Sequence, residues 1–401
     1  MNRKKILIAL FRLPYPATDG TRYKILYNLA EGLKKDFDIE FFVVNIKSYR
    51  QEDVNYLEQN FGKVHVFHHS KIAYGLNAIP ALFNGLPLQA QAFRFRDAQK
   101  WLDAHVGEYA AVYVHEIRMT EFFMRYSENQ KKNFLIDFND AISMNYRDGV
   151  KKMGLFKKLF YSWEGKRVAH YESKVLESFS HFSIVSDVDR QYLLSAPTYH
   201  GPKDIDFGVI LHGAPMVPVS ATLDRNSLFF MGSMDYEPNR DALSHFFSTI
   251  WPVVRQEMPD MEFLVIGGGH VPESYRSIPG VKFLGFVPNV FDAVQHSRAL
   301  IAPIRFAGGT PSKILEAMGY GIPVITTPIG AMGIAGSVPD ENILTISDTA
   351  PQAWVTAIER IITDDAWRTM LAANGRKLIM EKYSADAARD AFRKRLHTIV
   401  E

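Results

Sequence analysis

The 401-residue sequence contains no cysteine. This absence excludes disulfides, thiolate nucleophiles, iron–sulfur clusters and cysteine-ligated zinc, and it is compatible with a reducing compartment. The charges nearly cancel, because 46 Lys and Arg stand against 44 Asp and Glu for a net charge of +2. Dedicated nucleic-acid-binding proteins are usually markedly basic, so we expect no nucleic-acid partner.

Uninterrupted apolar runs of membrane-spanning length are also missing. The apolar run of residues 6–11 stops at Arg12 and is typical of a strand rather than of a signal peptide. The uncharged stretch of residues 317–339 is long enough to cross a bilayer, but prolines and glycines break it repeatedly. We therefore expect a cytoplasmic chain, with at most a peripheral location at the inner face of the cell membrane.

Short β-rich apolar runs alternate with segments of helical period along the whole chain. This alternation indicates an α/β fold of parallel sheets covered by helices on both faces. The segment 200–225 is rich in glycine and proline, and the strand–helix series restarts near residue 227. We predict two Rossmann-like domains facing each other across a cleft, 1–205 and 206–375, with a C-terminal helix over 376–401 that packs back on the N-terminal domain.

The strongest candidate site follows a predicted buried strand over residues 299–303. A turn with Gly308 and Gly309 leads from this strand into a helix. Thr310 is the predicted N-cap of that helix and Pro311 its first residue, where a missing N–H has no cost. Ligands of such sheets bind at the carboxyl ends of the strands, so this turn is the first place to search.

Lys313 falls in the first turn of the predicted helix, where a cation is unfavourable by about 0.3–1 kcal/mol. A bound anion would relieve this conflict, because glycines at 308 and 309 allow close approach and the helix N-terminus supplies N–H donors. Arg305 adds a second positive charge nearby. The alternative is a solvated lysine paired with Glu316 one turn further along.

Residues 308–331 closely resemble the donor-binding segment of family 4 (group 1) glycosyltransferases, and residues 230–239 resemble the strand that opens that family's C-terminal domain. Three shorter stretches match in order and spacing: residues 250–252, 264–269 and 284–287. The resemblance is strong from residue 227 to about 345 and weak before it. It implies the GT-B fold, and a retaining hexosyltransferase that uses a nucleotide-sugar donor and requires no metal or other cofactor.

The family motif also implies roles for individual residues. Glu316 would bind the ribose hydroxyls, and Lys313 with Arg305 would face the diphosphate as catalytic groups. Phe286 and Val287 would lie beside the base. The other residues expected to contact the donor sugar or phosphates are Gly20, Arg22, Gly232, Ser233, Gly308, Gly309, Thr310, Pro311 and Ser312.

Two departures from the family pattern concern charged donor contacts. The first of two glutamates that the family usually carries falls here on Gly308. An arginine that often follows the glycine of the first C-terminal strand is replaced by Ser233, and Pro238 and Asn239 occupy the region of a usual lysine. A similar glycine-for-glutamate pattern occurs in polysaccharide-biosynthesis members, so we still expect an active enzyme.

The N-terminal half supplies the expected acceptor side. One interpretation is that Gly20 permits backbone approach to a phosphate and that Arg22 reaches an anion. The other, equally supported, is that Asp19 and Gly20 form a turn that caps the next helix. Asp140 follows a strand where related transferases often have a histidine. Two roles are open to Asp140, acceptance of a proton from the acceptor hydroxyl and N-capping of the next helix, and the pattern favours the cap.

Residues 147–167 carry seven basic and two acidic residues interleaved with aromatic and aliphatic ones. This composition suits peripheral contact with anionic lipid, where a polyprenyl-linked acceptor would reside. The alternative is a helix with one core face and one solvated basic face.

The function that we expect is sugar transfer from a nucleotide-diphosphate donor to a saccharide. The expected acceptors are lipid-linked intermediates of polysaccharide or glycan assembly. Asp-x-Asp triplets are short enough to arise by chance, and the resemblance implies an enzyme that needs no such metal. The histidines at 65, 68 and 69 have no carboxylate partner at metal-ligand spacing, so we expect no metal site. Two alternatives stay open. One is a GT-B nucleotide-sugar epimerase, and the other is a non-catalytic sugar-nucleotide-binding partner of another transferase, suggested by Gly308 and Ser233.

Overall fold

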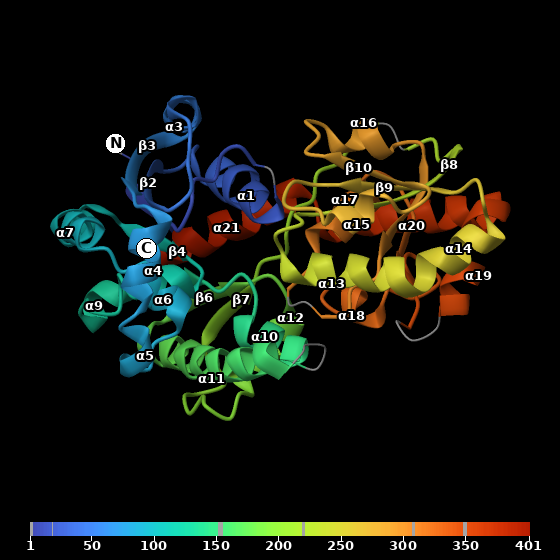
Figure 1. The fold of residues 1–401 in the computed structure, drawn as a ribbon. Coiled ribbons are helices and arrows are strands. Elements are labelled where there is room, and N and C mark those ends of the chain that lie inside the picture. Colours follow the sequence, from blue (N-terminus) through green and yellow to red (C-terminus); the bar gives the residue numbers. More distant parts are fainter. Residues whose placement is uncertain (1–2, 18, 151–154, 219–220, 307–308, 348–350) are drawn as a thin grey trace. The chain divides into compact units, whose positions relative to one another are not determined.

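The computed structural model describes residues 3–17, 19–150, 155–218, 221–306, 309–347 and 351–401. The chain divides into two compact units, Met1–Gly213 with Ala385–Glu401, and Ala214–Ser384 (Figure 1). Among the described residues, none of the helices combines the length and the apolar character that crossing a bilayer requires.

The first unit is built on a parallel sheet of seven strands in the order β3-β2-β1-β4-β5-β6-β7. The strand order reverses between β1 and β4, and the carboxyl ends beside such a switch point are where open α/β sheets bind ligands. The strands are β1 Lys5–Leu10, β2 Asp38–Asn45, β3 Gly62–His68, β4 Ala111–His115, β5 Phe134–Asp137, β6 His181–Ile184 and β7 Asp206–Val209.

Side chains of β1 alternate between two apolar cores, one on each face of this sheet. Ile6 and Ile8 pack in the core that contains Phe392, whereas Leu7 and Ala9 pack in the core that contains Phe122.

The helices of the first unit are α1 Gly20–Tyr23, the π-helix η1 Lys24–Ala30, α2 Glu31–Leu33, α3 Gln51–Asn60, α4 Lys71–Ala78, α5 Ala81–Asn84, α6 Leu88–Ala92, α7 Arg96–His105, the 3₁₀ turn η2 Val106–Glu108, α8 Ile117–Thr120, α9 Glu128–Lys131, α10 Ile142–Val150, α11 Leu155–Ser178, α12 Asp187–Leu194 and α21 Ala385–Val400.

The second unit has a parallel six-stranded sheet in the order β10-β9-β8-β11-β12-β13, with its switch point between β8 and β11. Its strands are β8 Arg225–Met231, β9 Glu262–Ile266, β10 Val281–Gly285, β11 Ser297–Ala302, β12 Val324–Thr326 and β13 Leu344–Thr345. Its helices are α13 Glu237–His245, the π-helix η3 Phe246–Ile250, α14 Trp251–Glu257, α15 Glu273–Arg276, α16 Val290–Val294, α17 Ser312–Gly319, α18 Pro328–Ala331, α19 Pro351–Thr363 and α20 Asp365–Lys382.

Two parallel sheets with helical connections confirm the predicted α/β class. The division between the units lies at Gly213 rather than at residue 205, because β7 pairs with β6 and completes the first sheet. The C-terminal segment also differs from the predicted helix over 376–401. Residues up to Lys382 belong to α20 of the second unit, and α21 alone joins the first, where it contacts η1 and α2.

Candidate functional site

Gly232 and Lys313 lie against each other at the carboxyl end of β8 in the second unit. A Cβ atom built on Gly232 would lie 3.0 Å from Lys313 Nζ and 2.5 Å from Asn239 Nδ2. The backbone of Gly232 has a φ of +149°, a conformation that favours glycine. Glycine is therefore required here, because any side chain would displace the ammonium group from the end of the strand.

The surroundings of the Lys313 ammonium are neutral. Its Nζ donates a hydrogen bond to Asn239 Oδ1 and lies 4.2 Å from the centroid of the Phe230 ring. Burial lowers the pKa of Lys313 to about 7. Within the described part of the chain no carboxylate pairs with this lysine, so the site offers a desolvated cation to an anionic ligand.

Glu316 faces Tyr320 on the same helix rather than Lys313. The Tyr320 hydroxyl donates to Glu316 Oε1 at 2.6 Å, and burial raises the pKa of the Glu316 carboxyl. The structure thus does not form the alternative ion pair of Lys313 with Glu316. A half-buried carboxylate fixed on one oxygen is suited to accept hydroxyl hydrogen bonds, although the ribose contact stays a prediction.

Helix α17 begins one residue later than predicted. Pro311, with φ −65° and ψ 103°, is the N-cap residue, and Ser312 is the first residue of the helix. Thr310 donates its hydroxyl proton to the Gly333 carbonyl at 2.8 Å, so this side chain ties the turn to a neighbouring loop. Gly309 has a φ of +69°. Gly308 lies outside the described residues.

Arg305 forms a bidentate ion pair with Asp241 of α13. Its Nε and Nη2 atoms donate to the two carboxylate oxygens at 2.8 and 2.5 Å. The positive charge of Arg305 is therefore compensated within the protein, unlike that of Lys313. In the described contacts Arg305 and Lys313 share no hydrogen-bond partner. Contact of Arg305 with the diphosphate therefore stays a prediction.

The other donor-binding residues predicted for this unit lie beside the ends of β8 and β10. The Ser233 carbonyl accepts from Asn239 Nδ2 at 2.8 Å. Phe286 and Val287 follow β10 directly, and the Phe286 ring is 64% exposed, which makes it available for stacking. In the described ranges, no cluster of three or more His, Asp or Glu side chains forms a metal-site arrangement.

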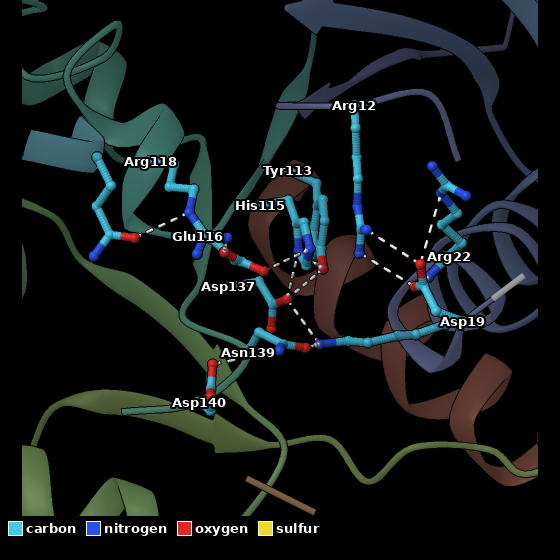
Figure 2. Close-up of polar contacts among 12 residues, drawn as sticks. Arg12, Asp19, Arg22, Tyr113, His115, Glu116, Arg118, Asp137, Asn139 and Asp140 are labelled. Atoms are coloured by element: carbon cyan, nitrogen blue, oxygen red, sulfur yellow. Dashed lines mark hydrogen bonds and ion pairs between the residues drawn. The ribbon is translucent and has the colours of Figure 1, made fainter. Parts of the chain in front are cut away.

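The first unit has a buried polar cluster centred on Asp137, at the end of β5 (Figure 2). Its carboxylate accepts hydrogen bonds from Lys24 Nζ at 2.7 Å, the Tyr113 hydroxyl at 2.6 Å, His115 Nδ1 at 3.1 Å and the Ser183 hydroxyl at 2.9 Å. Burial alone would raise the pKa of Asp137, but the Lys24 ammonium and His115 outweigh it and hold this pKa well below its ordinary value.

His115 and Glu116 occupy the turn that leaves β4. Glu116 has a φ of 61°, which is rare for a residue with a side chain and is typical of functional sites. His115 is 2% exposed, stacks on the Phe11 ring and lies with Nε2 3.5 Å from Glu116 Oε1. Glu116 also pairs with Arg118 (Figure 2). The carboxyl end of β4 thus places an imidazole and a carboxylate together beside the switch point.

Asp140 does not serve as the predicted N-cap in the contacts that the structure describes. The first amides of α10 are held by other carboxylates, since Ala141 N donates to Asp189 at 2.9 Å and Ser143 N to Glu172 at 3.2 Å. Asp140 accepts from the Asn145 side chain at 2.8 Å. Burial, with the nearby charges of Glu116 and Asp189, raises the pKa of Asp140 to about 7, a value suited to exchange of a proton near neutrality.

Gly20 and Arg22 form the start of α1, as the cap interpretation predicts. Asp19 is the N-cap residue, and its carboxylate accepts from the Arg22 amide at 3.0 Å and from Arg12 at 3.2 Å (Figure 2). Arg22 donates to the Pro16 carbonyl at 3.4 Å, and burial lowers the pKa of its guanidinium group. A contact with donor phosphates stays a prediction for both residues.

Three residues of the first-unit cluster were not candidates in the sequence: Lys24, His115 and Asp137. His115 and Asp137 end consecutive buried strands, where a doubly wound sheet binds ligands, but the sequence predicts a role there only for Asp140. Lys24 gave no such signal, because it lies within an amphipathic helical period and only the structure shows that it is completely buried.

Known proteins resemble this chain in sequence over part of its length and in fold over nearly all of it. Residues 225–364, all within the second unit, match the family model described as glycosyl transferases group 1. No curated protein sequence matches the chain.

Several solved structures share the fold of the whole chain. HepE from Anabaena in complex with UDP-glucose has a TM-score of 0.65 at 14% identity, over 99% of this chain and 100% of that one. The sucrose-phosphate synthase from Thermosynechococcus elongatus has a TM-score of 0.68 at 14% identity, over 99% of each chain. The pneumococcal O-GlcNAc transferase GtfA, in complex with UDP and GlcNAc, has a TM-score of 0.68 at 12% identity, over 100% of each chain. The chain thus has the GT-B fold of two Rossmann-like domains, and its second unit contains a segment that matches the group 1 glycosyl transferases.

Proposed function

We propose that the protein transfers a hexose-class sugar from a nucleoside diphosphate sugar to a saccharide acceptor, with retention of the anomeric configuration. The observation that carries this proposal is the half-buried Lys313 ammonium, held against Gly232 in neutral surroundings. HepE and GtfA, which share the fold, were crystallised with UDP-glucose and with UDP and GlcNAc, respectively. Their ligands support a nucleotide-sugar donor here.

Lys313 has the central role in this proposal. Transfer leaves a nucleoside diphosphate with developing negative charge, and a preorganised cation in a desolvated site stabilises that charge most effectively. Arg305, already balanced by Asp241, is a second and weaker contributor. We propose that these cations replace the divalent metal that other transferases use, with the nucleotide sugar as the only small-molecule requirement.

The remaining donor contacts follow from position. Glu316 would accept hydrogen bonds from the ribose diol, Phe286 and Val287 would lie beside the base, and the backbone of the turn before α17 would approach the sugar. On the acceptor side, Asp140 would accept the proton of the attacking hydroxyl, because burial keeps its pKa near neutrality. We further propose a lipid-linked saccharide of polysaccharide or glycan assembly as the acceptor.

The test is donor turnover by the purified chain. UDP-, GDP- and ADP-sugars are incubated without metal, alone and with saccharide acceptors, and both nucleoside diphosphate release and the anomeric configuration of the product are followed by NMR. We expect diphosphate release that rises with an acceptor, a product that retains configuration, and strong loss of activity in Lys313→Ala but not in Lys377→Ala, an exposed lysine of α20. Isomerisation of the donor sugar without an acceptor would indicate an epimerase instead. Tight nucleotide binding without turnover of any donor would indicate a non-catalytic partner.

A further inference from the structure

The first unit exposes large apolar side chains on α4 and α5, a region that gave no functional signal in the sequence. Phe83 is 86% exposed and Ile72 is 76% exposed, and Leu76, Ile79 and Leu82 are also exposed. Ile72, Leu76 and Ile79 recur at helical spacing and therefore share one face. Contiguous exposed apolar surface of this kind marks an interaction site in a folded protein.

The first part of α11 carries a second exposed apolar stripe. Leu155, Leu159 and Trp163 follow one another at intervals of four residues and lie on one helical face. All three are exposed, as is Phe160. The segment belongs to the basic stretch 147–167, whose Lys151 and Lys152 lie outside the described residues.

Hydrogen bonds hold these two regions together. Arg167 of α11 donates to the carbonyl of Ala81, the first residue of α5, and to the carbonyl of Leu86. Glu164 accepts from the amide of Leu88 at 2.7 Å, and α5 lies beside α11 in Figure 1. The exposed apolar residues of α4, α5 and α11 up to residue 163 thus belong to neighbouring elements of the first unit, and we call them together the α4–α11 surface.

The charged residues that α4, α5 and residues 155–167 of α11 expose are all basic. The sequence has no acidic residue from 59 to 96, and Lys71 is exposed at the start of α4. Lys157, Lys158 and Lys166 are exposed on α11. Glu164 is the one acidic residue of 155–167, and its side chain is 1% exposed and hydrogen-bonded to Leu88. Exposed apolar side chains on helices that also expose lysines match an anionic bilayer, because the apolar groups enter the headgroup boundary and the lysines contact phosphates.

We infer that the α4–α11 surface binds the face of an anionic bilayer, with the apolar residues of α4 and α5 as the inserted part. This inference extends the membrane contact expected for residues 147–167 to a second, more exposed element. It concerns the location of the enzyme and not its chemistry, so vesicle binding is measured without any donor.

The test is co-sedimentation of the full chain with vesicles of phosphatidylcholine alone and of phosphatidylcholine mixed with phosphatidylglycerol. We expect binding to the mixed vesicles only, weakened by salt. Phe83→Glu with Leu76→Glu should lower the bound fraction at least about tenfold. Lys157→Gln with Lys158→Gln should lower it by about fivefold for each charge removed. Met380→Glu, at an equally exposed apolar position of α20, is the matched control and should bind as the wild type does.

Thermal unfolding checks that every variant is folded, which is expected because the changed side chains are exposed. Binding by the wild type that survives the Phe83 and Leu76 substitutions would overturn the inference, as would no binding to mixed vesicles. A wild-type dimer that these substitutions convert to a monomer in light scattering, without vesicle binding, would assign the surface to self-association instead. UDP affinity measured in the same variants keeps this test apart from that of the proposed function, because it should not change.

Discussion

The Lys313 ammonium lies 4.2 Å from the centroid of the Phe230 ring. Phe230 belongs to β8 and Lys313 to α17. Gly232, which follows β8, has no side chain and so leaves room for the ammonium. The aromatic face stabilises a cation but supplies no compensating charge. A diphosphate would supply that charge, so donor binding and protonation of Lys313 should be coupled.

The first prediction concerns this coupling. Burial lowers the pKa of free Lys313 to about 7, so a growing fraction of the lysine is neutral as pH rises above that value. An anion favours the charged form, and UDP affinity should therefore fall between about pH 7 and pH 9, with proton uptake on binding. Calorimetry at pH 8 in two buffers of different ionisation enthalpy measures the uptake. No dependence on the buffer, or equal uptake in Lys313→Ala, would contradict the coupling.

The second prediction concerns Gly232. In Gly232→Ala the new Cβ would come within 3.0 Å of Lys313 Nζ, so the ammonium must move and UDP affinity should fall about tenfold, or about 1.4 kcal/mol. Gly268→Ala is the matched control, because its Cβ would meet no atom within 4 Å. Titration of UDP into both variants provides the comparison. Equal affinities would show that the position of Lys313 does not govern binding.

The third prediction concerns the buried Asp137–Lys24 pair, whose atoms lie 2.7 Å apart. Asp137→Ala leaves a buried ammonium without its partner, which should lower the free energy of unfolding by about 3–5 kcal/mol. Asp386→Ala, which breaks an exposed pair with Arg389, should cost less than about 1 kcal/mol. Urea unfolding gives both values. A cost below that of the exposed pair would contradict the assigned role of Asp137.

The same pair predicts the direction of the pH dependence. The folded state holds the pKa of Asp137 below its unfolded value of about 3.9. The stabilisation is therefore complete above that unfolded value and is lost as pH falls below it. The difference in unfolding free energy between wild type and Asp137→Ala should be constant near neutrality and shrink in acid.

The fourth prediction concerns Asp140. Its pKa of about 7 predicts that kcat at saturating donor rises with pH through about 7 as the carboxylate loses its proton. Asp140→Asn should remove this rise and lower kcat by about 10²-fold or more, with little change in the donor KM. Asp187→Asn, at an exposed position of α12, serves as the control. An unchanged pH profile in Asp140→Asn would assign proton acceptance to another group.

Four residues, Gly232, Lys313, Lys24 and Asp137, show which parts of the fold and site could be predicted from the sequence and which could not. Strand and helix periods predicted the α/β class. The position of Lys313 in the first turn of a helix singled it out, and the family resemblance singled out Gly232, which the fold places against Lys313. The start of α17 was off by one residue, because the N-cap depends on the ψ angle of Pro311. Lys24 and Asp137 could not be paired in advance, since their contact requires the strand order and the burial of a lysine inside an apolar helical face. The positive φ of Glu116 could not be predicted either, because no sequence pattern indicates it.

The most direct test of the donor site is calorimetric titration of UDP, GDP and ADP into the wild type, Lys313→Ala and Lys377→Ala at pH 7. We expect the wild type and Lys377→Ala to bind one of these nucleotides with equal affinity, and Lys313→Ala to bind it at least about tenfold more weakly, because a charge-assisted contact is lost. Equal affinity of Lys313→Ala and the wild type would contradict the account.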